Sequence, residues 1–298
     1  MSTEEDRAAG VLLGAACGDA LGVPYELGSR ALGERAEMLG GGLGGYAPGQ
    51  WSDDTEMACV IARVPGDLRT DAALDAVAAG FLDWFAAGPA DVGTQTAAVL
   101  GALRGTPRAG AAARMRERAA AVHAATGRSA GNGSLMRTAP VALRSTGVVE
   151  AARAVSGLTH HDPVAGDACV LWCLAIDRAV RTGELDVRVG LPHVDPAWEG
   201  WIDEAERNDP SAFAATNGWV VAALQGAWSA VAGARDLVDG LQAAVRGGGD
   251  TDTVAAIAGA LLGARFGASA VPGEWRRVVH GWPGLTGEDL VVLAGGAS

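Results

Sequence analysis

The sequence predicts an all-α protein, and three observations indicate this fold class. Apolar residues recur at three- and four-residue spacing through most of the 298 residues, which is the period of a buried helix face. Runs that alternate apolar and polar residues, as strands do, are nearly absent. Glycine and alanine are abundant where helices would meet, so backbones can approach closely. We therefore expect a single compact orthogonal bundle of many helices, forming one domain over residues 1–298.

The expected helices follow one another along the chain, and most of them end at glycine, as helices often do. Their apolar segments are 5–22, 70–88, 149–160, 165–183, 217–233 and 234–249, with two more after the acidic residues near 53 and 252. Three stretches interrupt the helical period with glycine, proline or asparagine, and we expect connections there: 31–50, 129–140 and 191–201. None is long enough to separate two domains.

The charge balance excludes several functions. The net charge is −12, and all 23 basic residues are arginine. General nucleic-acid binding requires a basic face, so we expect none. The absence of lysine also excludes Schiff-base chemistry and a P-loop with its phosphate-binding lysine.

Cysteine usage and hydropathy point to the cytoplasm. Cys17, Cys59, Cys169 and Cys173 all stand among apolar residues. Cys169 and Cys173 are four residues apart, but no second cysteine pair or histidine cluster completes a zinc site, so we expect reduced core residues. We expect no membrane partner, because no uninterrupted apolar run approaches the ~20 residues of a membrane span. The acidic first ten residues do not fit a secretory signal.

The segment "WSDDTEMA" (51–58) places Asp53 and Asp54 side by side before an apolar helix. Taken alone, it favours a helix cap, because Ser52 or Asp53 can accept from the first turn and Glu56 can close a capping box. The alternative is half of a metal site.

The segment "GGDTDT" (248–253) strengthens the metal interpretation. Asp250 and Asp252 follow three glycines and precede a second apolar helix. Four carboxylates at two buried helix starts would repel one another unless protons or a cation offset the charge. Oxygen ligands of this kind suit Mg²⁺, Mn²⁺ or Ca²⁺ rather than zinc.

Three further segments carry weaker signals. "GAACGDALGVPYELG" (14–28) contains Asp19, which also fits an ordinary helix-end residue, and Glu26. "GNGSLMR" (131–137) could present backbone N–H groups to an anion, or form a simple turn. "THHDPVAGDA" (159–168) contains His160 and His161, each of which also fits a structural histidine.

Together and in this order, the five segments resemble the ADP-ribosylglycohydrolase family, of the dinitrogenase-reductase-activating glycohydrolase type. The matching pieces run from residue 14 to residue 264, nearly the whole chain. The resemblance implies an all-α hydrolase with two Mg²⁺ or Mn²⁺ ions at helix starts. It implies an enzyme that acts on ADP-ribose attached to a protein side chain, with arginine as the expected acceptor. We also expect a monomer.

The resemblance also implies site residues. The metal ligands would be Ser52, Asp53, Asp54, Asp250, Asp252 and Thr253. Catalysis would depend on Asp54, Asp252 and Glu26, with Glu26 assisting the attacking water. The substrate would contact Asp91, Gly131, Asn132, Gly133, Ser134, Met136 and His160.

Alternatives remain open at this point. Thr94 stands where arginine-specific members are expected to carry asparagine, so a serine-linked or small-molecule conjugate is a second candidate substrate. A relative that binds ADP-ribose without turnover is a third reading, although all proposed ligand oxygens are retained. An isoprenoid synthase is disfavoured, because the Asp53–Asp54 pair lacks the later aspartate of a DDxxD pattern.

Overall fold

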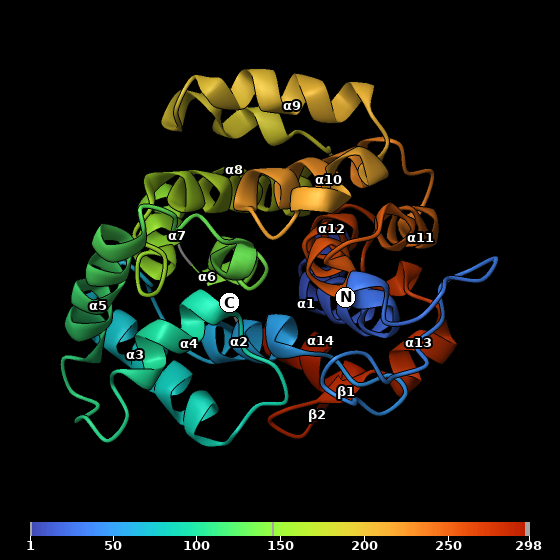
Figure 1. Ribbon diagram of the computed structural model, residues 1–298. Coiled ribbons are helices and arrows are strands. Elements are labelled where there is room, and N and C mark those ends of the chain that lie inside the picture. The colour runs from blue at the N-terminus through green and yellow to red at the C-terminus, as the bar shows by residue number, and fades with distance from the viewer. Residues whose placement is uncertain (1, 145, 296–298) are drawn as a thin grey trace.

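The computed structural model describes residues 2–144 and 146–295 and is built almost entirely of helices (Figure 1). Within these ranges the α-helices are α1 (Thr3–Gly22), α2 (Asp53–Ala62), α3 (Asp71–Ala86), α4 (Thr94–Gly101), α5 (Ala111–Thr126), α6 (Val141–Arg144), α7 (Val148–Ser156), α8 (Pro163–Thr182), α9 (Ala197–Arg207), α10 (Val220–Ala232), α11 (Leu237–Gly247), α12 (Thr251–Phe266), α13 (Gly273–Val278) and α14 (Gly287–Gly295). The shorter 3₁₀ segments are η1 (Val23–Gly28), η2 (Asn132–Ser134), η3 (Val187–His193), η4 (Pro210–Thr216) and η5 (Ala268–Ala270). The strands β1 (His280–Gly281) and β2 (Leu285–Thr286) form one antiparallel pair.

The all-α prediction is confirmed, and every apolar segment expected to be helical is helical. One boundary was wrong. The stretch 191–201 was expected to be a connection, but α9 begins inside it at Ala197, directly after Pro196. Proline is favoured at a helix start, where its missing N–H costs nothing. The small β1–β2 pair was not expected either.

The helices pack in crossing layers. In Figure 1, α8 and α10 run across the middle of the molecule, with α9 outside them. Helices α1 and α12 lie side by side below this layer and are seen nearly end-on. Helices α2 to α5 cover one flank, while α13, α14 and the strand pair cover the other. The steep crossing of the layers fits the expected orthogonal bundle.

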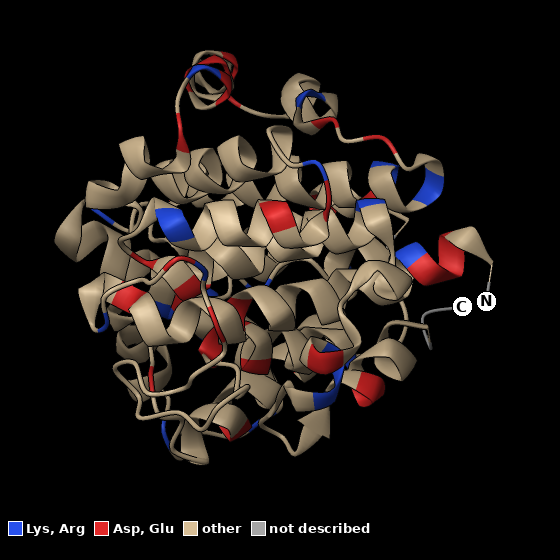
Figure 2. Cartoon of the chain, turned by 90° about the vertical axis from the view of Figure 1, so that its right-hand side faces the viewer, with Lys and Arg blue, Asp and Glu red and all other residues tan. Residues whose placement is uncertain are grey.

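A continuous apolar core joins these layers. Trp51, Trp84, Trp172 and Trp198 are among its largest fully buried side chains. All four cysteines are buried and free, which confirms their prediction as core residues. Figure 2 shows that uncharged ribbon dominates the molecule and that charged residues are scattered along it.

Helix α1 meets the length and composition of a membrane span, contrary to the expectation that no segment does. The span runs over Thr3–Gly28 and so continues through η1, and 94% of its apolar 18-residue window is buried inside the molecule. Core helices of soluble proteins and signal sequences near an N-terminus meet the same criteria, so the finding carries little weight. In this structure α1 is packed as a core helix.

A stripe of glycines joins α1 to α12, and it fixes the position of the site. Gly10, Gly14, Gly18 and Gly22 recur every four residues on one face of α1. A Cβ added to Gly14 would lie 2.2 Å from a backbone oxygen of α12, and one added to Gly18 would lie 2.0 Å from another. The two backbones are therefore in direct contact, which holds the end of α1 against the start of α12.

Candidate metal centre and active site

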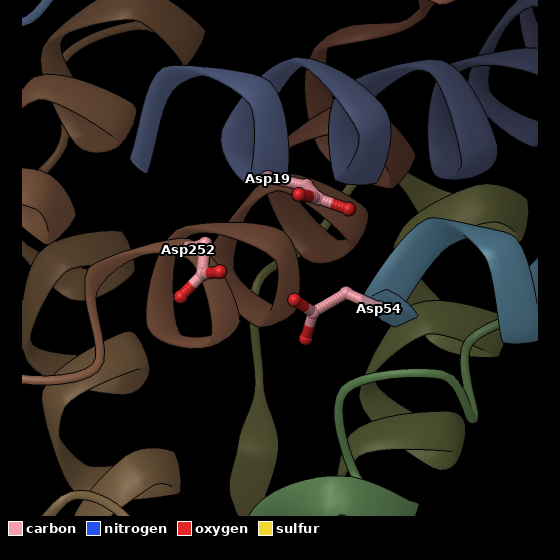
Figure 3. Close-up of side chains that lie close together, drawn as sticks. All are labelled: Asp19, Asp54 and Asp252. Atoms are coloured by element: carbon pink, nitrogen blue, oxygen red, sulfur yellow. The ribbon is translucent and has the colours of Figure 1, made fainter. Parts of the chain in front are cut away.

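Five carboxylates from three parts of the chain meet at the helix ends that this stripe brings together. We call them the carboxylate cluster; its members are Asp19, Glu26, Asp54, Asp250 and Asp252. Figure 3 shows Asp19 on α1, Asp54 at the start of α2 and Asp252 at the start of α12 facing a common space. The predicted pairing of the two acidic segments is confirmed, since they meet although about two hundred residues separate them in sequence.

The cluster contains two groups suited to a cation. In the first, oxygens of Asp19, Asp54 and Asp252 lie within 4.8 Å of one another. In the second, oxygens of Glu26, Asp250 and Asp252 do the same. Asp252 belongs to both groups and is almost fully buried.

Asp19 holds the start of α2. Its carboxylate accepts from the backbone N–H groups of Ser52 (2.8 Å) and Thr55 (3.1 Å), and from the Thr55 hydroxyl (2.6 Å). The cap interpretation of "WSDDTEMA" was therefore wrong in its details. The helix is capped from α1, Ser52 makes no cap with its side chain, and Glu56 accepts from the Trp84 indole at 2.5 Å.

Only one of the two carboxylate oxygens of Asp54 has a hydrogen-bond partner among the described residues. The Ser52 hydroxyl donates to its Oδ2 at 2.8 Å. Its Oδ1 is buried and has no hydrogen-bond partner among the described residues. A buried carboxylate oxygen without a partner is costly, and a proton or a cation bound to it would offset this cost.

A glycine turn and two asparagines position Asp250. Gly248 and Gly249 have φ angles of +81° and +74°, values that favour glycine over other residues. The Asn132 amide donates to Asp250 at 2.7 Å, and the Asn217 side chain accepts from the Asp250 N–H at 3.0 Å. The predicted function of the glycines, to permit a tight turn before two acids, is borne out by these angles.

The carboxylates raise one another's pKa values. Burial, followed by repulsion from Asp250, Asp91 and Asp19, raises the pKa of Glu26 to about 7. Burial raises the pKa of Asp19 to about 6 despite its hydrogen bonds. Burial and neighbouring acids also raise the pKa values of Asp54 and Asp252 well above the usual range. Neutralisation by protons or cations therefore stabilises the cluster near pH 7.

A cavity of about 950 Å³ opens next to the cluster. Its volume is at the upper end of the usual range for small-molecule sites, which is roughly 300–1,000 Å³. Most predicted site residues line it: Glu26, Asp53, Asp91, Gly131, Asn132, Gly133, Met136, His160, Asp250, Asp252 and Thr253. The sequence therefore located the walls of this cavity from segments scattered along the chain.

Three predicted residues lie elsewhere. Ser52 and Asp54 are almost fully buried and do not line the cavity. Ser134, predicted to bind substrate, is also buried, and its hydroxyl accepts from Ser156 at 3.0 Å. The side chain of Ser134 therefore packs into the core. Asp53 lines the cavity but belongs to neither three-carboxylate group.

His160 lies in the cavity wall as a neutral side chain. It is 3% exposed, and its Nδ1 lies 2.7 Å from the Thr159 hydroxyl. Burial and the nearby Arg137 guanidinium hold its pKa well below the usual 6.5. His161, its neighbour in sequence, is exposed.

Several site residues were missed by the sequence reasoning. Asp19 was weighed only as a helix-end residue, because nothing in its own segment shows which helix it caps. Asn217 and Gln95 support the site through their amides, and isolated amides carry no sequence signal. Trp219 stands at the cavity wall and is 43% exposed, an unusual exposure for tryptophan.

The chain is similar to known proteins along most of its length. The model of a family described as ADP-ribosylglycohydrolase matches residues 1–297. An ADP-ribosylarginine hydrolase, Tri1, of Pseudomonas putida (strain GB-1) is 30% identical over 281 residues, which is 91% of this chain and 73% of that protein. An ADP-ribosyl-[dinitrogen reductase] glycohydrolase of Rhodospirillum rubrum is 29% identical over 91% of this chain and 89% of its own.

A solved structure is also similar. It is a chain described as an ADP-ribosylglycohydrolase-related protein complex, with a TM-score of 0.76 and 28% sequence identity. The match covers 100% of this chain and 98% of the other. The helix arrangement described above is therefore shared along the full length of both chains.

Proposed function

Since the chain belongs to the ADP-ribosylglycohydrolase family, we propose that it releases ADP-ribose from arginine side chains of proteins with the help of two divalent cations. The family and the named relatives cleave ADP-ribosyl glycosidic bonds, so the chain is a hydrolase of this class. The arginine acceptor is proposed from the Pseudomonas putida relative, whose name specifies it. We also propose a cytoplasmic, monomeric, single-domain protein.

The observation that carries the metal proposal is the unpartnered Oδ1 of Asp54. Asp54 also offers an oxygen that lies within 4.8 Å of oxygens of Asp19 and Asp252. Carboxylates placed this close favour a bound cation. Because all the donors are hard oxygens, Mg²⁺ or Mn²⁺ fits them better than zinc does.

The two carboxylate groups would hold the two cations. Asp19, Asp54 and Asp252 would form one site, and Glu26, Asp250 and Asp252 the other. Ser52 and Thr253 would add hydroxyl oxygens, and Asp53 would contribute charge from the cavity wall. When bound, such cations supply charge compensation for the cluster and polarise water and ribose hydroxyls.

The chain's own residues perform the remaining tasks. The cavity binds the ADP-ribosyl group and orients its C1″ atom toward the carboxylate cluster, which reduces the entropic barrier. Glu26 lines the cavity, so its carboxylate is placed to accept a proton from the attacking water. Cleavage at C1″ passes through an oxocarbenium-like state, which nearby carboxylates stabilise.

The acceptor and metal requirements can be tested together. Peptides carrying ADP-ribose on arginine or on serine are incubated with the protein, with and without a chelator, and free ADP-ribose is measured. We expect release from the arginine peptide, loss of activity with chelator, and recovery on adding Mg²⁺ or Mn²⁺. Release from the serine peptide alone would contradict the arginine proposal and support the serine-linked alternative.

Replacing Asp54 tests the metal site directly. We expect Asp54→Asn to reduce hydrolysis roughly 100-fold or more, because a cation ligand and a cluster charge are both removed. Asp71→Asn is the matched control, since Asp71 is also an acid in the first turn of a helix but is exposed. Unchanged hydrolysis by Asp54→Asn in saturating Mg²⁺ would contradict the assignment.

A further inference from the structure

A buried arginine lies behind the cavity without a carboxylate partner. Arg137 is fully buried, and its guanidinium lies 4.6 Å from the centre of the Phe81 ring. It donates to the Thr159 hydroxyl and to the Met57 sulfur, the latter at 3.2 Å. Within the described residues, no hydrogen bond of Arg137 goes to an acid. Buried charges are normally paired with an opposite charge, so a buried guanidinium without one indicates that its N–H groups hold specific neighbours in place.

The donor chemistry of Arg137 sets the direction of the next hydrogen bond. Arginine only donates, so Thr159 Oγ1 accepts from it. The single hydroxyl proton of Thr159 is then free to bond to His160 Nδ1, 2.7 Å away. If Nδ1 carried a proton instead, the buried Thr159 hydroxyl proton would lack an acceptor among the described residues. That arrangement is disfavoured.

The direction of this bond fixes the histidine tautomer. With Nδ1 as the acceptor, the proton of the neutral ring sits on Nε2. That nitrogen faces the cavity wall at Gly131, since a Cβ added to Gly131 would lie 3.4 Å from it. Both residues line the cavity. His160 therefore presents an N–H donor where a ligand would lie.

We propose that Arg137 and Thr159 are positioning residues that hold His160 as a neutral Nε2–H donor for an acceptor oxygen of the bound ADP-ribosyl group. The ligand rests on the proposed function, whereas the tautomer does not. The cavity wall thereby gains a donor without gaining a positive charge. Protonated histidine would instead place a second cation next to the buried Arg137 guanidinium.

The test compares Thr159→Val, which removes the hydroxyl at nearly constant shape, with Thr159→Ser, which keeps it. Long-range ¹H–¹⁵N spectra of histidine-labelled protein in Mg²⁺ report which ring nitrogen carries the proton. We expect a protonated Nε2 in the wild type and in Thr159→Ser, and a shift toward mixed tautomers in Thr159→Val. Calorimetry with ADP-ribose should show binding weakened roughly threefold to tenfold in Thr159→Val alone.

Cation affinity serves as the control and should be equal in the two variants, because Thr159 lies outside the carboxylate cluster. A proton on Nδ1 in the wild type would overturn the proposal, as would identical spectra and affinities for the two variants. If the wild type shows a protonated Nε2 but binds no ADP-ribose, the ligand assignment fails together with the proposed function. The tautomer assignment would still stand in that case.

Discussion

Asp19 performs two tasks with one carboxylate. It caps the start of α2 through three hydrogen bonds, and one of its oxygens belongs to a three-carboxylate group with Asp54 and Asp252. The cap orients Asp54, because it holds the first turn of α2. The fold therefore prepares one side of the proposed cation site before any cation binds.

The two tasks can be separated by substitution. We expect Asp19→Ala to lower the free energy of unfolding by about 2–3 kcal/mol, because a buried cap to two N–H groups and a hydroxyl is lost. Asp19→Asn keeps an acceptor and should retain most of that stability, yet it should still weaken Mn²⁺ binding. Denaturant unfolding and calorimetric titration measure the two effects. Equal stability of Asp19→Ala and the wild type would contradict the capping role.

At the level of single residues, the sequence predicted chemistry better than contacts. Asp54, Asp250 and Asp252 stand out because two acidic segments each precede an apolar helix, where buried carboxylates would repel one another. Asp19 does not stand out in this way, since its partners are backbone groups on another helix. Ser134 shows the opposite error: its loop lines the cavity, but a three-residue 3₁₀ turn directs its side chain into the core.

Between elements, the glycine stripe of α1 sets the geometry of the site. Gly18 stands next to Asp19 and contacts α12 at Ala255, one turn beyond Asp252. We expect Gly18→Ala to destabilise the protein by about 1–3 kcal/mol or more, since its Cβ would lie 2.0 Å from a backbone oxygen that cannot rotate away. Activity should fall further than stability alone explains, because α1 and α12 must separate.

Gly200 provides the matched control. It lies within α9, and a Cβ added there meets no atom within 4 Å. We expect Gly200→Ala to stabilise the protein by roughly 0.5–1 kcal/mol, because alanine loses less conformational freedom in a helix. The two variants, Gly18→Ala and Gly200→Ala, are compared by thermal unfolding and by the rate of ADP-ribose release. Similar behaviour of the two variants would contradict the stripe's role.

Periodicity predicted many of the helices, although not α4 or α5, and it did not predict which helices pack together. The stripe in α1 and the glycines in α12 are both visible in the sequence, but many glycines elsewhere make turns instead. Only the structure pairs Gly14 with Gly259. The start of α9 was missed because Pro196 suggested a connection, although proline is equally compatible with a first helical turn.

Across the whole molecule, the buried acids make stability depend on pH in an unusual direction. The pKa values of Asp19, Glu26 and Glu56 are raised to about 6, about 7 and about 7, chiefly by burial. The folded protein therefore binds more protons than the unfolded chain between roughly pH 4 and 7, and its stability falls as the pH rises through this range. Arg235 lowers the pKa of Asp239 to about 2, so this residue changes the stability of the protein only at more acidic pH.

We therefore expect the chelated protein to have a higher Tm at about pH 5.5 than at about pH 7.5. Added Mg²⁺ or Mn²⁺ should raise Tm more at the higher pH, where cations displace fewer protons. Circular dichroism melting curves measure both effects, and Asp54→Asn should reduce the difference. A chelated Tm that increases from pH 5.5 to 7.5 would show that the cluster does not dominate this dependence.

The backbone contact between α1 and α12 also has an evolutionary consequence. Every substitution at Gly14 or Gly18 adds atoms where none fit, so these positions cannot drift through intermediate residues. The fold does not require the acids in the same way, since a neutral residue in place of Asp54 would reduce the repulsion among the carboxylates. A descendant that no longer needed turnover would therefore lose its acids first and keep its glycines. Among related sequences, those that keep the glycines but lack the acids would be proteins that retain the fold and have lost the catalytic activity.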